Sequence, residues 1–275
     1  MIFPAPTSPT LYRFRFVPAT TAADHDTFEM MERVENLAPD DVATLAPRAP
    51  SPTDATTANL EVIVVPSSAR GDLALRESLD AWLVAPDLSA PLSVQQGDVQ
   101  LAWRSGRAVL AFSAPLAPAA IEAIADFTAA ESELRRLEAD TVGAWATTEA
   151  DTPLTFAVKR QDKALLAGIG VRMQAVLLRR MKFARTEPRL LESPAHLAAT
   201  ARALGDRLRE AARCASRAEA LDAQIESQET VYELASQRIG EARHARESFA
   251  LEILIVVLLA AEVILMIWEV SLNYR

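Results

Sequence analysis

Three glutamates lie within the long apolar run near the end of the sequence, FALEILIVVLLAAEVILMIWEV (249–270). A carboxyl group surrounded by hydrocarbon must stay neutral or pair with a polar group, and such groups often mark functional positions. Glu252 and Glu269 lie near the two ends of the run, where they reach polar surroundings. Glu262 is therefore the sharpest candidate. It either pairs with a polar group of another subunit, or stays protonated and donates a hydrogen bond between helices within a small oligomer.

A second set of residues with shared chemistry lies on and just after the helix predicted for residues 160–183. We call these residues the basic face; they are Arg172, Arg179, Arg180, Lys182 and Arg185. Clustered cations on one side of a helix are typical of a contact with anionic lipid or with RNA. Most such faces, however, are simply solvated. Both interpretations stay open at this point.

No set of residues has the spacing of a catalytic or metal site. Residues 24–26 (DHD) offer metal-binding side chains, but zinc needs three or four convergent ligands and no further histidine lies nearby. Residues 168–170 (GIG) fall inside a helical pattern, so they lack the strand and glycine spacing of a nucleotide loop. Ser67 and Ser68 have no nucleophile-elbow frame. We therefore expect no enzymatic activity, no cofactor and no metal ion.

The composition narrows the class of protein further. The 275 residues include 37 acidic and 28 basic side chains, for a net charge of -9, which argues against broad nucleic-acid binding. Half of the residues are hydrophobic, so global disorder is excluded. Cys214 is the single cysteine, so no disulfide can form within the chain.

The elements that position these residues begin with a predicted α/β head. After a proline-rich extension with a strand-like LYRFRFV (11–17) and a short helix (27–37), the pattern alternates between periods of two and of about 3.6 residues. The order is β-α-β-β-α-β, which is typical of a ferredoxin-like fold. Its predicted strands are 60–65, 99–103, 108–112 and 134–145, with helices at 73–84 and after Pro118, and a further short strand at 154–158.

A helical region follows the head. The helix at 160–183 has one apolar stripe, and Pro188 and Pro194 mark a break after it. From about Ala195 onward, small or apolar residues recur in steps of four and three, the period of a coiled coil. This seam packs either on the 160–183 helix, as an antiparallel hairpin, or on another copy of the chain.

The apolar run is long enough to cross a bilayer. Its 22 residues span about 33 Å as a helix, against a hydrocarbon core of about 30 Å. Arg238, Arg243, His244 and Arg246 precede the run and only Arg275 follows it, so the bulk of the chain is expected on the inner side of the membrane. The rival interpretation is a buried helix of a water-soluble core.

The predicted fold class is thus α+β: a ferredoxin-like head, a long helical hairpin or coiled coil, and a single C-terminal transmembrane helix. The predicted regions are a proline-rich extension, an α/β head, a helical neck, a transmembrane helix and a short tail, at 1–59, 60–158, 159–248, 249–270 and 271–275.

Several stretches together resemble the "required for meiotic nuclear division" family. GDVQLAWRSGRAVLAF looks like the family's paired strands, and FAVKRQDKALLAGIGVRMQAVLLRR occupies the place of its first long helix. The C-terminal stretch is similar to its terminal signature, with the pairs Leu251-Glu252 and Glu262-Val263 at the family's separation. The family's aromatic residues are replaced here by RLL (189–191).

The resemblance covers about residues 58–270. It implies a single-pass protein of the mitochondrial inner membrane with its N-terminal bulk in the matrix, or alternatively of the bacterial cytoplasmic membrane facing the cytoplasm. It also implies a role in supporting translation of membrane proteins or organising complexes there. The partners would be the lipid bilayer, further copies of the chain or subunits of a larger membrane complex, and a ribosome or RNA at the basic face.

Three functions follow from these patterns. The first is a non-enzymatic membrane-tethered scaffold or assembly subunit. The second is an enzyme with an unrecognised active site in the α/β head. The third is an accessory subunit of a membrane transport or energy complex, with Glu262 as a proton site.

Overall fold

The computed structural model describes residues 6–17, 27–45, 60–84, 90–112, 117–157 and 163–273. The chain forms two compact units. The sheet unit contains residues 1–139 and 182–221, and the helical unit contains residues 140–181 and 222–275. The predicted α+β class is confirmed: a six-stranded sheet is followed by long helices.

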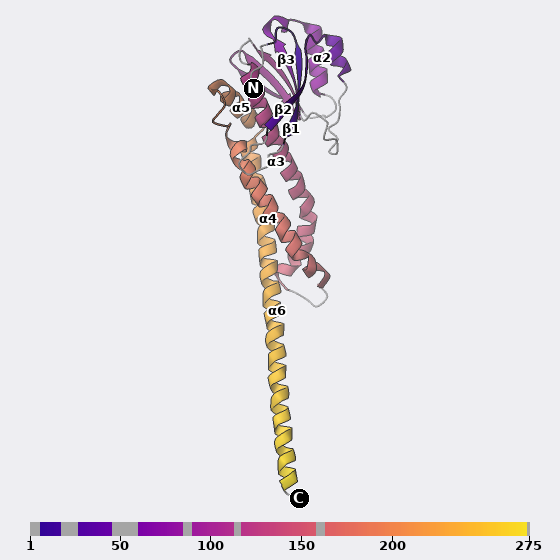
Figure 1. The fold of residues 1–275 in the computed structure, drawn as a ribbon, viewed down its shortest axis with the longest axis vertical. Helices are drawn as coiled ribbons and strands as arrows, with labels where there is room; N and C mark the ends of the chain where they lie inside the picture. Colours follow the sequence, from indigo (N-terminus) through magenta and orange to yellow (C-terminus); the bar gives the residue numbers. More distant parts are fainter. Residues whose placement is uncertain are drawn as a thin grey trace. The chain divides into compact units, whose positions relative to one another are not determined.

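The sheet has the strand order β2-β1-β3-β6-β5-β4. Figure 1 labels β1, β2 and β3 within it. β3 and β6 are parallel, and every other neighbouring pair is antiparallel. The strands are β1 (Thr10–Val17), β2 (Thr27–Val34), β3 (Leu60–Pro66), β4 (Leu92–Gln96), β5 (Val99–Arg104) and β6 (Arg107–Phe112).

Three long helices, α3, α4 and α6, contribute to both units. The α-helices are α1 (Pro39–Thr44), α2 (Leu73–Val84), α3 (Ala117–Asp151), α4 (Lys163–Leu191), α5 (Ala199–Ala211) and α6 (Cys214–Asn273). Two short 3-10 turns, η1 (Ser67–Ala69) and η2 (Thr152–Thr155), follow β3 and α3.

The two faces of the sheet are covered by different helices, because side chains alternate along each strand. Ile63 and Val65 of β3 belong to the core cluster that also contains Leu79 and Trp82 of α2. On the other face, the Trp103 ring of β5 packs edge-on against Phe127 of α3, with ring centroids 4.8 Å apart. The sheet is therefore buried on both sides.

One hydrogen bond joins β5 to α3 within this core. Trp103 Nε1 donates to Thr128 Oγ1 at 2.9 Å, and both residues are buried. Thr128→Val is expected to lower the free energy of unfolding by about 1–3 kcal/mol, because the indole N–H loses its partner in a dry site. Urea unfolding of the full chain measures this. Thr230→Val is the control, because its hydroxyl bonds to Glu226 O on an exposed helix surface; an equal loss in both variants would contradict the prediction.

The predicted strand at 134–145 is wrong, because these residues belong to helix α3. Leu134, Leu137 and Thr141 are buried at helical spacings of three and four, which leaves no period-two pattern. The predicted strand at 154–158 is also wrong over its described part, where η2 ends at Thr155.

The position beside β3 is filled instead by β1, from the proline-rich extension. The strand-like segment at 11–17 forms an interior strand of the sheet, because β2 pairs along its other side. The predicted helix at 27–37 is wrong, since residues 27–34 form β2. Ion pairs between neighbouring strands stabilise this arrangement: Arg13 binds Glu32 at 2.5 Å, and Arg15 binds Glu29 at 2.7 Å.

The long helix expected from about Ala195 is divided into α5 and α6. The division falls at Arg213, whose positive φ of 53° is incompatible with a continuous helix. By contrast, α4 is longer than the predicted helix. Pro188 lies inside it, and the helix ends at Leu191.

The predicted seam is buried within the chain itself up to Ala235, except at Ala211 and Ala215, which are exposed where α5 ends and α6 begins. Its members in the sheet unit include Leu204, Leu208 and Leu221, and in the helical unit Ile225 and Tyr232. In the helical unit Gln228 Nε2 donates to Thr141 O of α3 at 3.1 Å. The seam thus packs on α3 as well as beside α4, rather than on α4 alone.

Candidate functional site

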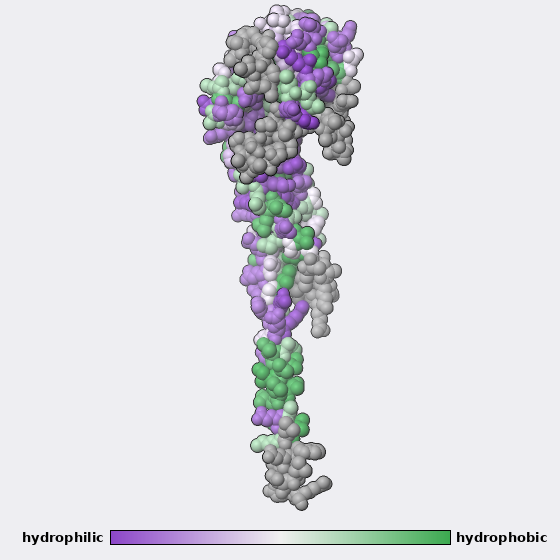
Figure 2. All heavy atoms as spheres, in the orientation of Figure 1, coloured by the Kyte–Doolittle hydropathy of each residue, from purple (hydrophilic) through white to green (hydrophobic). Residues whose placement is uncertain are grey.

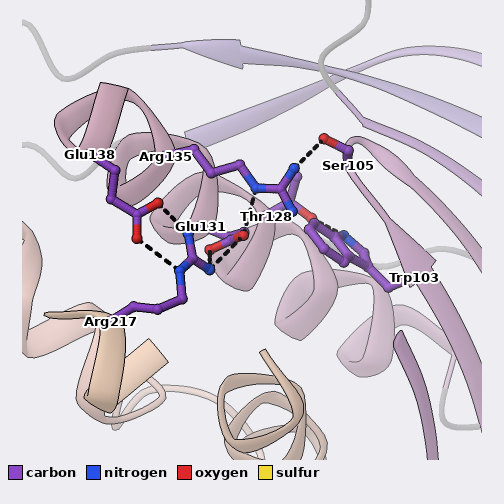
Figure 3. Close-up of polar contacts among 7 residues, drawn as sticks. All are labelled: Trp103, Ser105, Thr128, Glu131, Arg135, Glu138 and Arg217. Atoms are coloured by element: carbon purple, nitrogen blue, oxygen red, sulfur yellow. Dashed lines mark hydrogen bonds and ion pairs between the residues drawn. The ribbon is translucent and has the colours of Figure 1, made fainter. Parts of the chain in front are cut away.

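A cluster of polar side chains in the sheet unit surrounds a buried carboxylate on α3 (Figure 3). The Glu131 side chain is only 2% exposed. Arg217, in the first turn of α6, donates from Nη1 to both Glu131 oxygens at 2.9 Å. Arg135 Nε donates to Glu131 Oε1 at 2.7 Å. We call Glu131, Arg135, Glu138 and Arg217 the polar cluster.

The cluster forms because its α3 members are four and three residues apart, on one side of the helix. Arg217 reaches Glu138 as well, through Nε at 2.9 Å and Nη2 at 2.6 Å. Arg135 lies over the Trp103 ring, 5.8 Å from its centroid, and donates to Ser105 Oγ at 3.0 Å. The cluster therefore connects α3, the β5–β6 turn and the beginning of α6.

The charges in the polar cluster balance, with two carboxylates and two guanidinium groups. Hydrogen bonding to Glu138 raises the pKa of Arg217, so this cation keeps its charge. Among the described residues no group of His, Cys, Asp or Glu is arranged to hold a metal ion. The arrangement suits the fixing of α6 onto α3 better than the transfer of a proton.

The thiol of Cys214, next to the polar cluster, is expected to be unreactive because burial keeps it protonated. Burial, and then the nearby Glu131 charge, raise the pKa of Cys214 to about 11. At pH 8 only about one thiol in a thousand is ionised, against about a quarter for an ordinary cysteine. Maleimide labelling of the folded chain at pH 8 should therefore be slow, and should become fast in denaturant. Rapid labelling of the folded chain would contradict this assignment.

The basic face is largely engaged by groups of its own unit. In the helical unit Arg172 Nε lies 2.6 Å from Asp151, Arg179 donates to Asp140 O at 2.9 Å, and Arg180 binds Asp222. Burial lowers the pKa of Arg179. The other two members, Lys182 and Arg185, lie exposed on α4 in the sheet unit. These pairings reduce the charge available to lipid or RNA.

The last part of α6 exposes apolar side chains (Figure 2), and because the exposed residues are consecutive they occupy all sides of the helix. Glu252 and Glu262 are exposed among them, while Glu269 lies on the same helix with its side chain outside the described part. The large apolar residues that are 47–68% exposed here are Phe249, Leu251, Ile253, Leu254, Ile255, Val256, Val257, Leu258, Leu259, Val263, Ile264 and Met266. We call this stretch the apolar run.

Within the described residues, no helix has the length and apolar character needed to cross a membrane.

Sequence reasoning missed the polar cluster and found the apolar run. Glu131 and Arg217 are 86 residues apart, and the strand predicted at 134–145 concealed the helical spacing of Glu131, Arg135 and Glu138. That spacing was the one available signal. The motif at 24–26 lies outside the described residues, and residues 168–170 lie in α4.

No family model matches the sequence, and no curated protein matches it.

Proposed function

We propose that this chain is a membrane-tethered scaffold without catalytic activity of its own. The observation that carries the proposal is the apolar run at the end of α6, whose large side chains are exposed on all sides of the helix. A helix that is hydrophobic all round is covered by a protein core or by lipid. Nothing in the helical unit covers this run among the described residues, so lipid is the proposed solvent.

The position of the run on α6 supports this assignment. The buried seam of α6 ends at Ala235, and from Glu241 to Glu262 the described side chains are exposed apart from the half-buried Ala242. The preceding turns carry ion pairs suited to water, such as Arg243 with Glu247 at 3.2 Å. The sequence stays apolar beyond Met266 to Val270, and so reaches the length of a span.

The charges beside the run give the orientation. Arg238, Arg243 and Arg246 precede it, and among residues 271–275 Arg275 is the one basic residue. By the positive-inside rule, the sheet unit and the helical bundle lie on the cytoplasmic or matrix side. The resemblance of the sequence extends this proposal to the mitochondrial inner membrane, with the bacterial cytoplasmic membrane as the alternative.

A scaffold role suits the sheet unit. The ferredoxin-like order predicted for this unit is wrong in detail: β3 and β6 are parallel, whereas a ferredoxin-like sheet is antiparallel throughout, and α2 and α3 cover opposite faces of the sheet. The most buried charged group there, Glu131, is bound by two arginines, and the one thiol is protonated. Supporting translation or organising complexes at the membrane is the role we propose for this surface.

Alkaline carbonate extraction of the full chain tests the tether. We expect the protein to stay in the membrane pellet at pH 11, as integral proteins do, because the apolar run is solvated by acyl chains. Release into the supernatant would refute the membrane assignment.

A further inference from the structure

The two described glutamates of the apolar run fall on one stripe of α6. Glu252 and Glu262 are ten residues apart, and Glu269 follows seven residues later. At about 100° per residue, these positions lie within an arc of about 100°. Together with Ile255, Leu259 and Met266 they advance in alternating steps of three and four, the period of two helices packed along each other. We call these six positions the acid stripe.

The acids of this stripe have no partner within their own run. Residues 249–270 contain no lysine, arginine, histidine, serine, threonine, asparagine or glutamine, and their one side-chain N–H is that of Trp268, six residues beyond Glu262. Glu252 and Glu262 are exposed, and their neighbours on α6 include the exposed Ile255, Leu259 and Met266. Because a carboxyl group within a bilayer faces protein or water rather than lipid, the partner of Glu262 must come from outside this helix.

We propose that the acid stripe binds a second copy of this chain, so that two α6 helices pair in parallel within the membrane. This inference rests on the proposed membrane tether. Two copies inserted in the same orientation bring Glu262 to the same depth, so the two carboxyl groups meet across a twofold axis. A neutral carboxyl group both donates and accepts a hydrogen bond, which makes the stripe complementary to itself.

A helix with a lysine or arginine is the competing partner. It would bring a second ionised group into hydrocarbon, and the desolvation of both ions opposes their attraction. A pair of carboxyl groups needs no ion. The chain therefore supplies its own partner at lower cost than a foreign cation does.

Energy transfer between two labelled populations of the full chain tests the proposal. Both populations are reconstituted into phosphatidylcholine–phosphatidylglycerol vesicles, and association is read as the lipid is diluted. Glu262→Leu should weaken association roughly three- to thirty-fold, the range for one interhelical hydrogen bond. Glu262→Gln should retain it, because an amide also donates and accepts.

A matched pair of variants separates the stripe from the rest of the helix. Leu259→Ala removes packing on the acid stripe and should weaken association. Ile264→Ala removes a similar volume about 170° from the centre of the acid stripe and should leave association unchanged. Equal effects of the two variants, or equal association of wild type and Glu262→Leu, would overturn the proposal.

Carbonate extraction of the same vesicles distinguishes this inference from the function on which it rests. A chain that is retained in the vesicles but shows no energy transfer refutes the pairing alone. A chain that shows energy transfer only after a cationic partner helix is added refutes it as well. A chain that is extracted refutes both the tether and the pairing.

Discussion

Replacing Leu254 and Leu258 together with arginine should release the chain from the membrane. The two residues lie one turn apart in the first half of the apolar run and are 53% and 61% exposed. An arginine at the centre of a span costs about 2.5–3.5 kcal/mol on insertion scales, so the pair costs at most about 5–7 kcal/mol. Fractionation of cells expressing the full chain should show the variant in the supernatant and the wild type in the pellet.

The matched control places the same two charges on α6 before the run. Ser227 and Ser236 are exposed on the helical unit, so Ser227→Arg with Ser236→Arg adds the same charge without entering the apolar segment. This variant should fractionate with the wild type. If both double variants stay in the pellet, insertion of the run does not hold the chain to the membrane.

Arg217→Met should lower the free energy of unfolding of the sheet unit by more than the loss of an exposed ion pair would. The change removes the cation that binds both Glu131 and Glu138, and leaves Glu131 buried with Arg135 alone. Breaking a fully buried pair costs about 3–5 kcal/mol; because Arg217 is 28% exposed, we expect about 2–4 kcal/mol. Urea unfolding of the full chain in detergent, followed by tryptophan fluorescence, measures this loss.

Two further variants test the cause of that loss. Arg136→Met removes a pair with Glu133 that is largely solvated, and should cost no more than about 0.5 kcal/mol. Combining Arg217→Met with Glu131→Leu removes the stranded charge and should recover part of the loss. If the double variant is less stable than the sum of its single changes predicts, the buried charge is not the cause.

The parts of the fold that the sequence predicted are those with a clean local period. The strands at 60–65, 99–103 and 108–112 and the helix at 73–84 all occur, because their alternation or helical spacing matches the face that each one buries. The apolar run could be found for the same reason, since its composition needs no knowledge of contacts.

The parts that the sequence did not predict depend on distant partners. Residues 27–34 have a composition that suits a helix, yet pairing with β1 through Arg13 and Arg15 makes them a strand. The polar cluster joins residues up to 86 positions apart, so no local pattern contains it. The break at Arg213 likewise has no proline or glycine to mark it.

Crosslinking to a photoactivatable lipid tests the membrane claim most directly. A phospholipid with a diazirine in the middle of its acyl chain is incorporated into membranes that hold the full chain, and the adducts are mapped by mass spectrometry. We predict adducts between Phe249 and Val270, and none on the exposed surface of α6 around Ser227. A lack of lipid adducts between Phe249 and Val270, or equal labelling of the α6 surface around Ser227, would contradict the account.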